Sequence, residues 1–110
     1  MIAFFDCLHD LGDPIGAAGH AHQTLASDGT VFIVEPMAGE RVEDNLTPLG
    51  RAVSGASTLM CTPHSLFTGG PALGALASEA QLRDVIYAGG FGQFRRATET
   101  PFNRIFEVRR

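Results

Sequence analysis

Ionisable and sulfur-containing side chains gather within the first ten residues of this chain. The run Ile2 to Cys7 is apolar apart from Asp6, and His9 and Asp10 follow it directly. An imidazole titrates near neutral pH and serves as a general base more often than any other side chain. His9 is therefore our candidate catalytic residue, with a loop histidine of no chemical role as the alternative.

The neighbours of His9 are candidates for ligand contacts. Asp6 and Cys7 end the apolar run, and open α/β sheets bind ligands beyond the carboxyl ends of their strands. The alternatives are an aspartate satisfied by backbone amides and a cysteine packed as a small hydrophobe. If the segment stays extended, Asp10 points away from His9, so we predict a loop or substrate contact for it.

Glu35 follows a second apolar run, Thr30 to Val34. A carboxylate behind an imidazole can fix its tautomer and orientation, so Glu35 is a candidate for orienting His9. A strand-end acid without a role is the alternative.

Several residues are of metal-ligating types, with H-x-H and C-x-x-H spacings: Cys7, His9, His20, His22, Cys61 and His64. His20 and His22 are two residues apart on a predicted helix, so they face different directions. The chain has no C-x-x-C pair. We therefore predict no metal site.

The elements that must position these groups begin with a βαβ unit. Ile2 to Cys7 and Thr30 to Val34 are typical of buried parallel strands. Asp13 and Pro14 predict a helix start, and Ser27-Asp28-Gly29 predicts its end, with Gly29 in a left-handed conformation.

The remainder predicts two further helices and a hairpin. Residues 49–60 favour a helix, and the Gly- and Pro-rich residues 62–74 predict irregular structure or a flap. Ser78 and Gln81 form a capping box at the start of another helix, which Gly89-Gly90 ends. Residues 91–100 and 104–108 predict an antiparallel pair of strands.

Composition limits the function classes. The 110 residues form one predicted domain, 45% hydrophobic, with a net charge of −4. This charge argues against nucleic-acid binding, and no apolar run is long enough for a membrane span or resembles a secretory signal. Two cysteines are too few for a disulfide framework, which favours a reduced, cytoplasmic protein.

The order of these elements resembles the C-terminal half of a class I S-adenosylmethionine-dependent methyltransferase. The resemblance rests on FFDCLHDLGDP, LASDGTVFIVEP, EAQLRDVIYAGGFGQFRRATET and FNRIFEVRR, at residues 4–14, 25–36, 79–100 and 102–110. It implies an α/β, Rossmann-like half-sheet of four to five strands flanked by helices, and O-methylation of a small-molecule substrate. His9 would then remove the proton of the substrate hydroxyl, and Asp6 and Cys7 would contact the cofactor S-adenosylmethionine.

The chain departs from that family in one respect. No strand precedes a glycine-rich cofactor-binding turn, so residues 1–110 correspond to a partial methyltransferase domain. We expect the first strand to form an exposed sheet edge, which favours pairing with a second copy. The alternative to an enzyme is therefore an inactive, truncated methyltransferase fragment that forms a homodimer through this edge or complements a missing N-terminal half.

Overall fold

The computed structural model describes residues 1–110 and has an α/β fold around a four-stranded mixed sheet. The strands are β1 (Ile2–Phe5), β2 (Val31–Pro36), β3 (Gln93–Glu99) and β4 (Asn103–Arg109), in the order β1-β2-β4-β3. β1 and β2 are parallel, and β4 is antiparallel to both β2 and β3. The predicted βαβ unit and C-terminal hairpin are confirmed.

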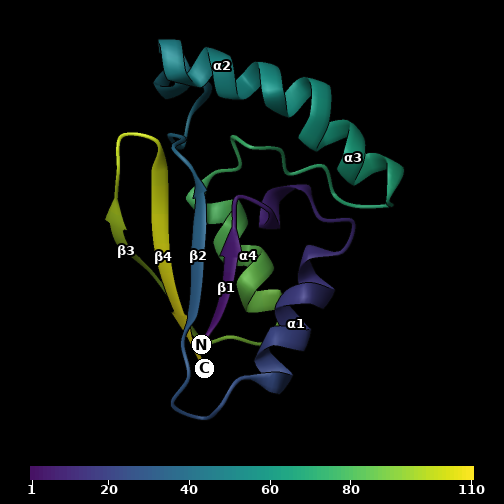
Figure 1. Cartoon of the computed structure of the whole chain (residues 1–110), viewed down its shortest axis with the longest axis vertical. Helices are drawn as coiled ribbons and strands as arrows, with labels where there is room; N and C mark the ends of the chain where they lie inside the picture. The colour runs from purple at the N-terminus through teal and green to yellow at the C-terminus, as the bar shows by residue number, and fades with distance from the viewer.

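Two helices, α1 (Pro14–Thr24) and α4 (Glu79–Ala88), pack against each other and against one face of the sheet (Figure 1). Their apolar stripes bury against alternate residues of the central strands, because side chains of a strand alternate between its two faces. The resulting core includes Ala18, Ala21, Val31, Ile33, Leu82, Ile86, Phe106 and Val108.

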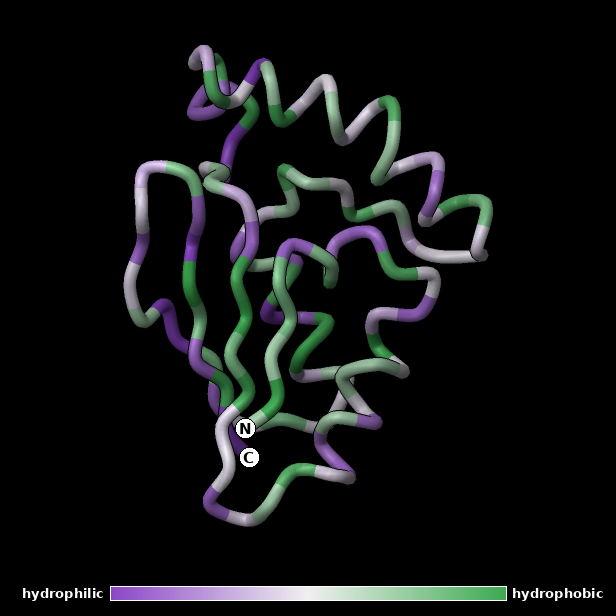
Figure 2. The backbone as a smooth tube through the Cα atoms, in the orientation of Figure 1, coloured by the Kyte–Doolittle hydropathy of each residue, from purple (hydrophilic) through white to green (hydrophobic).

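The opposite face of the sheet carries no helix (Figure 1). Phe5 on that face is 64% exposed, and Ala3 is exposed as well. Figure 2 shows the hydrophobic residues concentrated along β1, β2 and β4. None of the helices has the length and apolar character needed to cross a membrane.

The start of α1 is as predicted, and its end is not. The Asp13 side chain accepts a hydrogen bond from the Gly16 N–H, and Pro14 occupies the first turn. The helix ends at Thr24, where the Leu25 N–H bonds the Ala21 carbonyl and the chain becomes extended. The predicted left-handed stop at Gly29 is wrong: burial of Leu25 turns the chain before the glycine is reached.

A single helical arm runs from residue 48 to residue 67 beyond the carboxyl ends of β1 and β2 (Figure 1). It comprises α2 (Pro48–Ala56), a π-turn (Ser57–Cys61) and α3 (Thr62–Phe67). The prediction of irregular structure from residue 62 is therefore wrong as far as Phe67. Pro63 has no N–H to donate, and the helix widens just before it, where the Thr62 N–H bonds the Ser57 carbonyl five residues earlier.

The last helix and hairpin match the prediction closely. Ser78 and Gln81 form the capping box of α4, and Gly90 after the helix has a positive φ of 101°. The turn between β3 and β4 is closed by a hydrogen bond from the Thr100 N–H to the Asn103 carbonyl.

Candidate functional site

The candidate base His9 lies in a short 3-10 turn, Leu8–Asp10, directly after β1. Asp6 has a positive φ of 47°, which turns the chain out of the strand, and its carboxylate accepts a hydrogen bond from Asn103 Nδ2 at 3.0 Å. His9 is only 3% exposed. The imidazole is therefore held in a largely water-free position at the sheet edge.

Glu35 contacts His9 directly. Its carboxylate is fully buried, and Oε2 lies 2.5 Å from His9 Nδ1. Oε1 accepts a second hydrogen bond, from the Leu8 N–H at 3.0 Å. Because an ionised carboxylate only accepts, Nδ1 carries the proton in this pair, and Nε2 is left as the second functional atom of the imidazole.

Burial and the carboxylate act in opposite directions on His9. Burial disfavours the charged imidazolium and lowers its pKa, whereas the hydrogen bond and the charge of Glu35 favour it. The combined interaction with Glu35 prevails, so the pKa of His9 lies above its ordinary value. The pair is thus arranged to hold a proton on the imidazole.

Cys61, on the helical arm, lies at Nε2 of His9. The Sγ–Nε2 distance is 3.4 Å, and burial together with the charge of Asp10 raises the pKa of this thiol. Asp10 is also close: ligand atoms of His9, Asp10 and Cys61 all lie within 4.8 Å of one another. The segment forms a 3-10 turn, so the extended conformation in which Asp10 would point away from His9 does not occur.

Two buried serines hold the arm over His9. Ser57 Oγ accepts a hydrogen bond from the Ala75 N–H, and Ser65 Oγ donates to the Leu11 carbonyl and accepts from the Ala72 N–H. Gly74, with a φ of +75°, donates its N–H to the His9 carbonyl.

Close approach of backbones also depends on Gly70. A Cβ at that position would lie 2.3 Å from Ser65 Oγ and 2.5 Å from the Leu11 carbonyl oxygen. Residues 68–74 belong to the segment for which the sequence predicts irregular structure or a flap. They form the connection that fixes the arm to the His9 turn.

Arg104 is the cross-strand partner of Glu35 and is fully buried beside it. Its Nε donates to the Pro36 carbonyl and Nη2 to the Ala77 carbonyl, each at 2.9 Å, whereas Nη1 has no partner. Burial lowers the pKa of this guanidinium, and the charge of Glu35 opposes the shift. Neither Arg104 nor Cys61 was among the predicted site residues.

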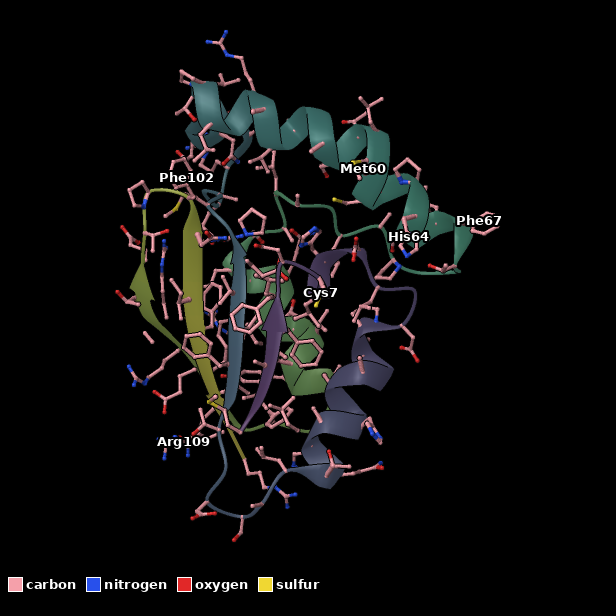
Figure 3. The ribbon with its side chains drawn as sticks, viewed as in Figure 1. Cys7, Met60, His64, Phe67, Phe102 and Arg109 are labelled. Atoms are coloured by element: carbon pink, nitrogen blue, oxygen red, sulfur yellow. The ribbon has the colours of Figure 1, made fainter.

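Cys7 lies at the end of β1, partly buried (Figure 3). Burial raises its pKa, which keeps it protonated, as expected for a packed thiol. His64 is exposed on α3 and, with His20 and His22, lies outside the group around Cys61 (Figure 3). Four pockets open on the surface, and none is lined by Asp6, Cys7 or His9.

Comparison with known proteins does not assign the chain. No protein-family model matches it, and no curated protein matches its sequence. The geometry of the residues themselves must therefore support any function.

Proposed function

We propose that the chain supplies the general base of an O-methyl-transfer site for a small hydroxylated molecule. The observation that carries the proposal is the 2.5 Å contact between His9 Nδ1 and the buried Glu35 carboxylate. This contact leaves Nε2 as a proton acceptor, the arrangement in which a carboxylate fixes the tautomer of a catalytic imidazole. A hydroxyl is a poor nucleophile until such a base takes its proton.

The resemblance to class I methyltransferases supports S-adenosylmethionine as the methyl donor. The residues around His9 do not by themselves form a pocket for a molecule of that size, and the Asp6 carboxylate is already paired with Asn103. Asp6 and Cys7 stay predicted cofactor contacts. The part of the reaction assigned to this chain is the acceptance of a proton at His9 Nε2.

Access to that atom is controlled by Cys61. Its thiol occupies the position 3.4 Å from Nε2 where a substrate hydroxyl would have to lie. A substrate therefore reaches the base only when the Cys61 side chain rotates away or the helical arm shifts.

A second candidate function is a non-catalytic homodimer, and the position of β1 favours it. β1 is an edge strand, paired only with β2. The N–H groups of Ile2 and Asp6 bond the β2 side. By strand alternation, the N–H groups of Ala3 and Phe5 point to the free edge, where a second copy can pair.

Titration calorimetry of the whole chain with S-adenosylhomocysteine, with the mass followed by light scattering, separates the two candidates. Micromolar binding supports the enzyme. His9→Ala should then lower methyl transfer from labelled S-adenosylmethionine by roughly 100-fold or more, with the exposed His64→Ala as the control. A folded dimer that binds no cofactor supports the second candidate and contradicts the first for this chain.

The dimer interface has its own matched pair of variants. Ala3→Pro removes an edge N–H on β1 and should convert a dimer to a monomer. Ala97→Pro places the same change in the bulge of the opposite edge strand, β3, and should leave the mass unchanged. A dimer that survives Ala3→Pro would rule out pairing through β1.

A further inference from the structure

The thiol of Cys61, the carboxylate of Asp10 and Nε2 of His9 converge from two distant parts of the chain. Their ligand atoms lie within 4.8 Å of one another, and the Nε2–Sγ distance is 3.4 Å. In a tetrahedral zinc site, Zn–N and Zn–S bonds of about 2.05 and 2.3 Å place nitrogen and sulfur roughly 3.6 Å apart. The two best-placed ligand atoms therefore already have the required separation.

The other ring nitrogen of His9, Nδ1, already has the hydrogen-bond partner that a zinc-bound histidine needs. A metal-bound histidine almost always donates its other N–H to a carboxylate or carbonyl, which fixes the ring and raises its basicity. Glu35 accepts this hydrogen bond at 2.5 Å and is itself held by the Leu8 N–H. The site thus has an outer layer of hydrogen bonds as well as three ligand types.

We propose that His9, Asp10 and Cys61 form a binding site for Zn²⁺, with Glu35 as the carboxylate that orients the histidine. The thiolate and imidazole select zinc over Mg²⁺ and Ca²⁺, which prefer all-oxygen ligands. Three protein ligands leave a fourth position for water or an external ligand.

The zinc site goes beyond the proposed methyl transfer and competes with it. Both uses require the lone pair of His9 Nε2, so a chain saturated with zinc has no free base at this position. Zinc would accordingly inhibit the proposed reaction. Metal binding is measured without any activity, so failure of one proposal is distinguishable from failure of the other.

Cobalt substitution tests the site directly. The metal-free chain, titrated with Co²⁺, should bind one ion and show the thiolate-to-cobalt charge-transfer band with the visible bands of a tetrahedral site. Added Zn²⁺ should remove both signals. Cys61→Ser should abolish the charge-transfer band, and the matched Cys7→Ser should retain it. A spectrum without the thiolate band, or equal losses in the two variants, would overturn the proposal.

Two further variants report on the ligand Asp10 and on the orienting carboxylate of Glu35. Asp10→Asn and Glu35→Gln should each weaken zinc binding by roughly 10-fold to 100-fold, the range typical of outer hydrogen-bonding partners or a lost ligand charge. His64→Ala, which removes an exposed histidine from the same arm, should leave the affinity unchanged. An equal loss in His64→Ala would place the zinc on the surface instead.

A protection experiment needs no substitution at Cys61 and therefore does not depend on the folding of a variant. Zn²⁺ should slow alkylation of Cys61 by iodoacetamide at least about tenfold, read by mass spectrometry, since the metal-bound thiolate is shielded. Cys7 provides the control within the same molecule and should change less than about twofold. Equal rates at Cys61 with and without Zn²⁺ would contradict the site.

Discussion

The two helical regions of this protein are held in different ways. α1 and α4 bury apolar side chains against the sheet, and the core residues Leu82 and Phe106 are fully buried. The helical arm instead exposes its large apolar residues, with Phe67 91% and Leu59 80% exposed. Its contacts with the rest of the molecule include the hydrogen bonds of Ser57 and Ser65 and the contact of Cys61 with His9. The arm that carries Cys61 is therefore the part of the candidate site most easily displaced.

The largest expected difference between the two regions is in the free energy of unfolding lost when one aromatic ring is removed from each. Phe106→Ala should lower the free energy of unfolding by about 3–5 kcal/mol, because it opens a cavity in the core. Phe67→Ala, at the exposed end of the arm (Figure 3), should change it by less than about 0.5 kcal/mol. Urea denaturation measures both. Similar losses would mean that another surface covers Phe67 in solution.

Glu35→Gln is expected to have the next largest effect, because it removes the charge-assisted hydrogen bond to His9. The free energy of unfolding should fall by about 1.5–3 kcal/mol at pH 6. The pKa of His9, measured by NMR titration of the metal-free protein, should fall as well, since burial then acts without its opposing carboxylate. An unchanged His9 pKa would contradict the contact.

The pH dependence of stability follows from the same pair. The pKa of His9 is raised in the folded chain, so the folded state holds its proton more tightly than the unfolded state. The stabilisation is fully present below the pKa of the unfolded histidine and is lost as the pH rises through that of the folded one. Denaturation of the metal-free wild type across this window should show the loss, and Glu35→Gln should show a smaller one.

Ser65→Ala tests how the arm is attached. It removes the donor to the Leu11 carbonyl and the acceptor for the Ala72 N–H, at a cost of about 1–2 kcal/mol. Hydrogen exchange should accelerate in residues 57–67 and not in α4. Ser54→Ala, whose hydroxyl makes no hydrogen bond in the structure, is the matched control. Acceleration spread over the core would show that the two regions unfold together.

The smallest comparison uses the two N-caps that precede a proline. Asp13 caps α1 and Thr47 caps α2, and each accepts the N–H three residues later. Asp13→Ala should cost about 1 kcal/mol of global stability. Thr47→Ala should instead speed hydrogen exchange locally in α2 and leave the midpoint of urea denaturation nearly unchanged. A reversal of the two outcomes would contradict the assignment of the arm as the weaker region.

The regular elements were predictable because their signals are local. The cap at Asp13, the capping box at Ser78 and the short link between residues 91–100 and 104–108 each depend on neighbouring residues in the sequence. The end of α1 was not, because burial of Leu25 is a tertiary effect. The helix through residue 67 was missed since Pro63 indicates a break, and only the π-turn before it lets the helix continue.

The site could be predicted only in part. Glu35 lies near the end of β2 and His9 lies in the turn that follows the parallel neighbour β1, so their meeting follows from the βαβ unit. Cys61 lies 52 residues from His9 and reaches it through Ser57, Ser65 and the glycines after them, none of which has a sequence pattern that identifies its partner. Arg104 did carry a signal: an arginine directly before the apolar residues Ile105 and Phe106 of a central strand indicates a buried polar contact.

The position of β4 between β2 and β3 affects how the protein is made. Until residues 103–109 have left the ribosome, the growing chain lacks the strand that joins β2 to β3, and Phe106 and Val108 are missing from its core. β2 is then paired only with β1, and its other edge is exposed, which is where off-pathway pairing begins. Loss of the last strand should accordingly leave an aggregating chain.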